Sequence, residues 1–152
     1  MQKRDLLFGF LLFVLLVGYF FLMKAANLYE NFNLRFVNVI FYLGVTWLAI
    51  RKFYKDRPKS EFNYISGLLA GFRPALIGVV LFAGFQMIYL NIDTHLMDSI
   101  AERAPMGDVL NPFTSTLYLL FEGIAVGLIG SYLTMRVVDH NQIKDEEYEE
   151  RL

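Results

Sequence analysis

Four long apolar segments, separated by short polar links, dominate the chain. They cover residues 6–23, about 34–52, 62–91 and 112–135. A transmembrane helix needs about 20 mostly apolar residues to cross a hydrocarbon core of ~30 Å. The segments lack strict apolar–polar alternation, and each is too long for a barrel strand of about 10 residues. The pattern therefore predicts an all-α polytopic membrane protein, a bundle of four transmembrane helices.

The link between the third and fourth segments predicts a short outer amphipathic helix. Asp93 or Thr94 can cap its start, and Ala104-Pro105 stops it. Its apolar positions recur at helical spacing: Leu96, Met97 and Ile100. Residues 1–136 then form the membrane domain. Residues 137–152 form an acidic tail, typical of a solvated helix end, a disordered segment or a docking segment for a basic partner.

The first segment has a second interpretation as a secretory signal peptide, because Lys3 and Arg4 precede it. A signal peptide has an apolar region of about 7–15 residues and a small-x-small cleavage site. The apolar run here is longer, and Met23-Lys24-Ala25-Ala26 lacks that cleavage pattern. These features favour a retained transmembrane helix.

Basic residues predict the orientation in the membrane, since short cytoplasmic loops carry an excess of Lys and Arg. The link between the second and third segments holds the densest basic cluster, and Lys3 and Arg4 fall on the same side. The link over residues 91–111 is acidic instead. Both termini are therefore expected in the cytoplasm. The basic loop comprises Arg51, Lys52, Lys55, Arg57 and Lys59.

Composition agrees with a membrane protein and narrows the function. The chain is 56% hydrophobic and 19% charged, against roughly 45–50% and ~25% in soluble domains. The net charge of −1 gives no basic face for nucleic acid. There is no cysteine, which excludes disulfides and thiolate sites. His95 and His140 fall on opposite sides of the expected membrane, so no metal or other cofactor is predicted and no catalytic constellation emerges.

Arg73 and Glu122 are the charged residues that lie well inside apolar segments. A charge at that depth costs at least about 2.5–3.5 kcal/mol on insertion scales and usually finds a partner inside the bundle. Counted from the cytoplasmic ends at Phe62 and Met135, the two residues lie roughly 17 and 20 Å into the membrane. We therefore expect an intramembrane ion pair. A structural lock, a proton or ion site, and binding of a small anion by Arg73 are all compatible with it.

Glycine and serine residues favour contact between the third and fourth segments. On each segment they recur every four residues, which lets two helix backbones approach closely. Pro74 removes a helical hydrogen bond and predicts a kink beside Arg73. The helix-packing positions are Gly67 and Gly71 on the third segment, and Gly123, Gly127 and Ser131 on the fourth.

The second half of the chain resembles a family of small four-span inner-membrane proteins of unknown function found in Bacteroidota. The resemblance rests on residues 62–72, which open the third segment, on residues 87–93, which close it, and on the glycine-rich fourth segment. It implies four helices in a bacterial inner membrane and supplies no activity.

Three functions are open on the sequence. The first is a non-catalytic accessory subunit of a larger membrane complex, or a homo-oligomer, in contact with lipid and with other subunits or itself. The second is a small transporter or channel that uses Arg73 and Glu122. The third is a lipid-modifying enzyme, which would need a polar cluster at a membrane interface, and the sequence offers none.

Overall fold

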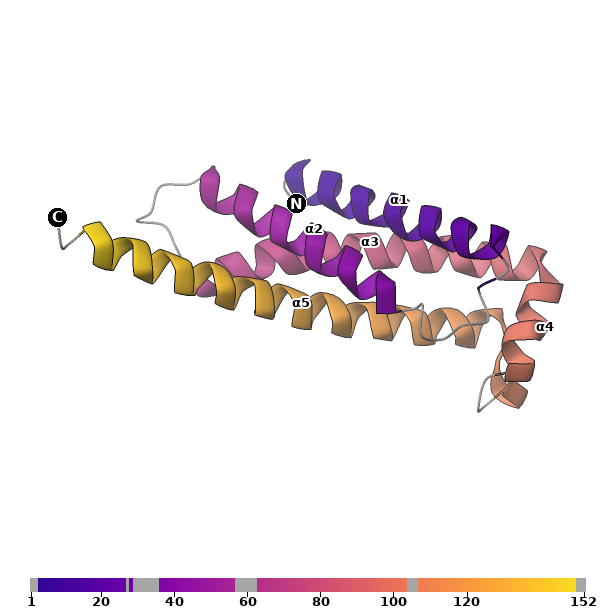
Figure 1. The fold of residues 1–152 in the computed structure, drawn as a ribbon. Helices are drawn as coiled ribbons and strands as arrows, with labels where there is room; N and C mark the ends of the chain where they lie inside the picture. Colours follow the sequence, from indigo (N-terminus) through magenta and orange to yellow (C-terminus); the bar gives the residue numbers. More distant parts are fainter. Residues whose placement is uncertain (1–2, 27, 29–35, 57–62, 104–106, 150–152) are drawn as a thin grey trace.

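The computed structural model describes residues 3–26, 28, 36–56, 63–103 and 107–149, without the side chains of residues 103 and 139–149. Four long helices form an elongated bundle, and a short helix lies across one end of it (Figure 1). The long helices are α1 (Lys3–Ala25), α2 (Phe36–Lys55), α3 (Tyr64–Ile92) and α5 (Pro112–Glu149). The short helix is α4 (Thr94–Arg103), followed by the 3-10 turn η3 (Gly107–Val109). The predicted all-α four-helix bundle is confirmed.

The helix ends differ from the predicted spans by up to one turn at most places. Residues 34, 35 and 62, which the sequence placed inside spans, lie outside the described residues. The largest difference is in α5, which continues without a break to Glu149. The described part of the predicted acidic tail is therefore helical, and it extends beyond the other helices (Figure 1).

Asp93 makes the sharp corner between α3 and α4. Its backbone N–H donates to the carbonyl of Tyr89 at 2.9 Å, which closes the last turn of α3. Its side chain accepts from the backbone N–H of Leu96 at 3.1 Å and so caps α4. Of the two capping residues that the sequence allowed, Asp93 is the one that makes this bond.

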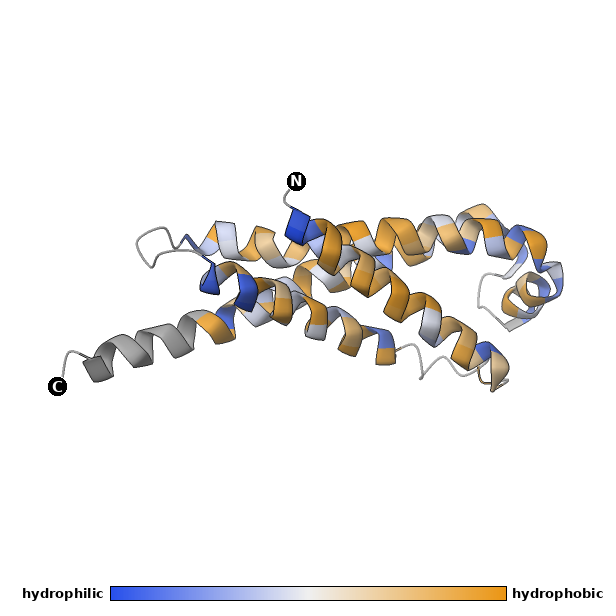
Figure 2. Ribbon diagram, turned by 90° about the horizontal axis from the view of Figure 1, so that it is seen from above, coloured by the Kyte–Doolittle hydropathy of each residue, from blue (hydrophilic) through white to orange (hydrophobic). Residues whose placement is uncertain are grey.

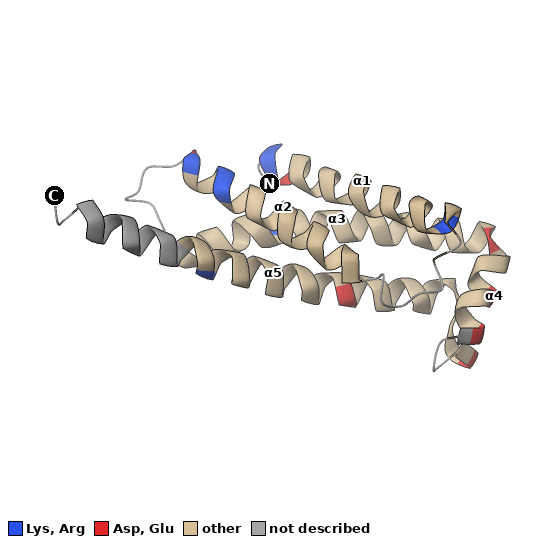
Figure 3. Cartoon of the chain, in the orientation of Figure 1, with Lys and Arg blue, Asp and Glu red and all other residues tan. Residues whose placement is uncertain are grey.

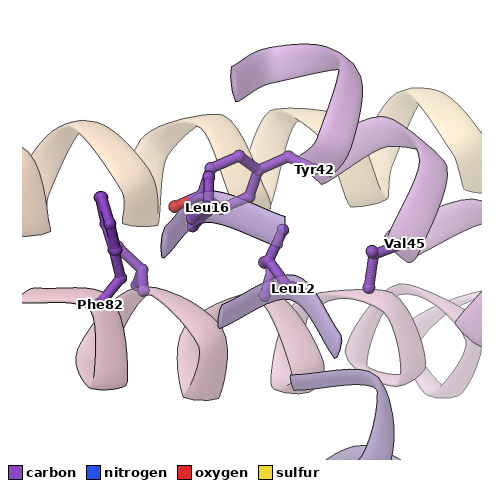
Figure 4. Close-up of a cluster of buried hydrophobic side chains, with 7 residues drawn as sticks. Leu12, Leu16, Tyr42, Val45 and Phe82 are labelled. Carbon is purple, nitrogen blue, oxygen red and sulfur yellow. The ribbon is translucent and has the colours of Figure 1, made fainter. Parts of the chain in front are cut away.

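The central helix is α3, which packs against α1, α2 and α5. Its inner faces and those of α1 and α2 form one apolar core, which holds Leu12, Leu16, Tyr42, Val45 and Phe82 (Figure 4). A second, smaller cluster at the corner joins α3 to α4 through Leu90, Leu96 and Met97. The apolar side of α4 is thus buried on the bundle.

The outward faces of the long helices are apolar too. Leu7 is 64% exposed and Ile88 is 66% exposed, and hydrophobic colour covers the middle of the long helices (Figure 2). Large apolar side chains on all outer faces of a bundle indicate that lipid surrounds it. Each of the four helices is also long and apolar enough to cross a membrane. The fold is that of a multi-pass membrane protein.

Glycines set the distance between α3 and α5. A Cβ atom on Gly71 would lie 2.5 Å from Ser131 Oγ, and one on Gly67 would lie 2.5 Å from Met135 Sδ. Further along, Gly127 faces Ala75, and a Cβ on Gly123 would lie 2.2 Å from Val79 Cγ2. The four pairs follow a single antiparallel register. The packing positions named from the sequence therefore lie at this contact.

Substituting Gly123 with leucine should force α3 and α5 apart, because Val79 is branched at Cβ and has little freedom to move. We expect a loss of about 1–3 kcal/mol in unfolding free energy, typical of overpacking. Reversible unfolding in mixed detergent measures it. Gly18→Leu on α1 is the matched control, since no atom lies within 4 Å of a Cβ there. Equal stability of the two variants would contradict the close-contact interpretation.

Candidate functional site

Arg73 lies on the outward face of α3. Its side chain is exposed, whereas Gly71, Pro74 and Ala75 beside it are buried. It makes no hydrogen bond or ion pair with any residue that the structure describes. Arg73 comes nine positions after Tyr64, the first residue of α3, which is about 14 Å along the helix axis. The bundle thus presents a cation outward within a membrane-spanning helix.

The structure does not bring Arg73 and Glu122 together. The register that aligns Gly71 with Ser131 places Arg73 level with Ile129, seven residues along α5 from Glu122. Seven residues correspond to about 10 Å along the axis. Both side chains are exposed, and the ion pairs between described residues do not include this one. The expected ion pair between Arg73 and Glu122 is therefore wrong.

The error comes from the stagger of the two helices. The depths of Arg73 and Glu122 were counted from Phe62 and Met135. This count assumed that Phe62 and Met135 lie at the same membrane depth. In the structure Met135 lies level with Gly67 instead. Helix α5 continues beyond its apolar run to Glu149, so the end of that run does not mark the level at which α3 begins. Helix α3 also continues through Pro74, which is buried within it.

Hydroxyl groups connect the helices in the half of the bundle where α2 ends and α3 begins. Ser131 Oγ, with 0% exposure, donates to the carbonyl oxygen of Leu68 at 2.6 Å across the α3–α5 contact. The hydroxyls of Thr46 and Thr134 lie 3.4 Å apart between α2 and α5. Such bonds hold transmembrane helices together without forming a reactive site.

The basic loop is described in part. Arg51, Lys52 and Lys55 are exposed in the last turns of α2, and Lys52 Nζ lies 3.0 Å from Asp56 Oδ1. Arg57 and Lys59 lie outside the described residues. Cations gather at this end of α1 and α2, and acidic residues gather on and beside α4 at the other end (Figure 3).

A polar cluster at the α4 end was not anticipated from the sequence. Lys24 Nζ, from the last turn of α1, lies 2.5 Å from Asp93 Oδ2 and also donates to the hydroxyl of Tyr89. The Tyr89 hydroxyl in turn donates to Asp93 at 3.4 Å. Hydrogen bonding to the Lys24 ammonium lowers the pKa of Asp93 below its usual range, and the backbone N–H of Leu96 acts in the same direction. The cluster ties α1 to the α3–α4 corner.

Two sequence signals were present for this cluster. Lys24 directly follows the first apolar segment and Asp93 closely follows the third, so two parallel helices place opposite charges at one end. The role of these contacts is structural, because they join one helix to another. Within the described residues there is no group of three or more His, Asp or Glu side chains that could hold a metal ion. His95 is exposed on α4, and the side chain of His140 lies outside the described part.

A comparison with known families gives the identity of the chain at the level of its family. Residues 6–105 match the family described as Protein of unknown function (DUF4199). Because the match covers well over half of the chain, the chain belongs to this family. The match spans α1 to α4, whereas the resemblance noted in the sequence lay in the second half. No curated protein and no solved structure matches the chain.

Replacing Asp93 with asparagine should remove the ion pair with Lys24 while keeping a helix cap, because asparagine caps as well as aspartate. We expect a lower melting temperature at neutral pH. The lowered pKa of Asp93 means that its stabilisation is present above the ordinary carboxyl pKa and is lost as pH falls through the folded-state value. Thermal melts from neutral to acidic pH should therefore bring wild type and variant together.

Asp98→Asn on the exposed side of α4 provides the control, since Asp98 has no ion pair among the described residues. It should melt like wild type at every pH. A constant gap between wild type and Asp93→Asn down to acidic pH would show that the effect is not electrostatic.

Proposed function

We propose that this protein is a non-catalytic membrane subunit that assembles with a different membrane protein through the outward face of α3. The observation that carries the proposal is Arg73, an exposed cation at membrane depth without a partner in the described chain. Charged residues in transmembrane helices are costly and almost always face a partner or a water-filled cavity. A carboxylate on a helix of another protein would supply the missing partner.

The residues around Arg73 are suited to helix packing. Leu69, Val80 and Met87 are exposed on the same side of α3, at the spacing of a two-helix seam. Gly84 lies on this seam, and a Cβ built on it meets no atom within 4 Å. A glycine on an open face lets a second helix approach closely. We call these four residues, together with Arg73, the α3 seam.

Symmetry favours a different protein over a second copy. Two copies inserted the same way and related by a two-fold axis place identical residues at the same depth. Pairing through the α3 seam would then set Arg73 against Arg73, and like charges repel strongly at low dielectric. Pairing Arg73 with Glu122 of a second copy would leave the same offset of about 10 Å along the membrane normal.

The transporter alternative depended on an Arg73–Glu122 pair within the bundle, and the register separates the two residues. The described core is instead apolar apart from a few buried polar residues, including Thr46, Gln86 and Ser131. An accessory role agrees with this interior. The basic end of the bundle supports placement of both termini in the cytoplasm, and a bacterial inner membrane stays part of the proposal.

Purification from the native membrane in mild detergent tests the role. Wild type should retain a stoichiometric membrane partner with an acidic residue at membrane depth. Arg73→Leu should fold as well as wild type, because the side chain contacts no partner in the described chain. It should lower partner recovery at least tenfold, since breaking a buried charge pair costs about 2–5 kcal/mol. Quantitative mass spectrometry measures the ratio.

Two controls sharpen the experiment. Arg136→Leu removes another exposed cation, on α5, and should leave the partner bound. Exchanging the charges, with Arg73→Glu and an arginine in place of the partner's acidic residue, should restore recovery. Unchanged recovery with Arg73→Leu, or a wild-type protein that is a monomer or a homo-oligomer, would overturn the proposal.

A further inference from the structure

The corner where α1 begins and α2 ends holds a second feature, independent of the α3 seam. Arg4 folds inward there, and its side chain is 15% exposed. Its guanidinium carbon lies 4.9 Å from the centre of the Phe53 ring, on which it stacks. Phe53 is itself 4% exposed. Packing therefore fixes the position of the guanidinium.

Part of the Arg4 guanidinium is left without an acceptor. One of its nitrogens, Nη2, lies 3.4 Å from Asp5 Oδ1, and Asp5 is almost wholly buried. The buried Nε has no hydrogen-bond partner among the described residues. A buried donor without an acceptor is costly, so native proteins rarely keep one without a ligand, ion or water beside it. The unused N–H therefore points to an acceptor outside the described residues.

The charge of the described side chains at this corner favours an anion as the acceptor. The described acidic residues at this end of α1 and α2 are Asp5, which faces Arg4, and Asp56, which pairs with Lys52. Exposed cations lie in the first turn of α1 and the last turns of α2, and they outnumber these two carboxylates (Figure 3). They are Lys3, Arg51, Lys52 and Lys55. Guanidinium groups bind phosphate oxygens with well-matched geometry.

We propose that the corner formed by Arg4 and Phe53 binds the phosphate of an anionic phospholipid headgroup, in the leaflet at the basic end of the bundle. The location selects a lipid over a free anion, because the corner lies at the end of two transmembrane helices whose outward faces are apolar. Acyl chains can lie along those faces while the phosphate meets Arg4. Basic sites between transmembrane helices bind acidic headgroups in this way.

Lipid titration of the purified full-length chain in detergent, followed by native mass spectrometry, tests the proposal. Phosphatidylglycerol should remain bound as a discrete adduct, and phosphatidylcholine should not. Arg4→Gln should weaken phosphatidylglycerol binding about fivefold, the usual effect of one cation near a membrane surface. Arg136→Gln, which removes an exposed cation on α5 rather than on α1 or α2, should weaken binding less than Arg4→Gln does.

Further experiments identify the source of the anion and keep the test valid if a variant misfolds. Inorganic phosphate, added at the concentration of the lipid, should not compete, and competition would overturn the lipid assignment. Arg4→Lys keeps the charge without the Nε–H group and should restore binding only in part. Full restoration, or equal binding by wild type and Arg4→Gln, would overturn the site. If Arg4→Gln unfolds, the exposed pair Lys3→Gln and Lys55→Gln should weaken binding, and unchanged binding would overturn the proposal.

Discussion

The close approach of α3 and α5 is the constraint on which the other contacts depend. Inside a bilayer, burying apolar side chains gives little driving force, since lipid is as apolar as leucine. Tight van der Waals packing has to supply the attraction, and glycine makes it possible. Gly71 and Gly123 each bring a partner side chain closer to the backbone than any larger residue would allow. Helix α3 is thereby fixed at the centre, and α1 and α2 pack around it.

Polar contacts then secure this packing at both ends of the bundle. The Ser131–Leu68 hydrogen bond lies on the glycine register, so it forms only when α3 and α5 are fully in contact. At the other end, Lys24 joins α1 to Asp93, which also ends α3 and caps α4. One aspartate therefore sets the direction of the chain and receives the charge of a neighbouring helix.

The sequence predicted elements well and contacts less well, for physical reasons. Apolar length reports a membrane span directly, so all four long helices and α4 were expected near their observed positions. Glycine spacing reports a close-packed face, and Gly67 and Gly123 do lie at one. Stagger and rotation depend on all contacts of a helix together. This is why Arg73 was assigned the wrong neighbour and why the Lys24–Asp93 contact was missed.

An outward Arg73 changes how the whole bundle is understood. Had it faced inward, the protein would contain a polar interior, and transport would be the natural hypothesis. Instead the glycine contact uses the inner face of α3 so completely that no room for an arginine remains beside Gly71 and Ala75. The charge is left on the face that meets the surroundings. The same packing that stabilises the bundle thus leaves Arg73 without an acceptor among the described residues, and the proposed assembly with another protein rests on this.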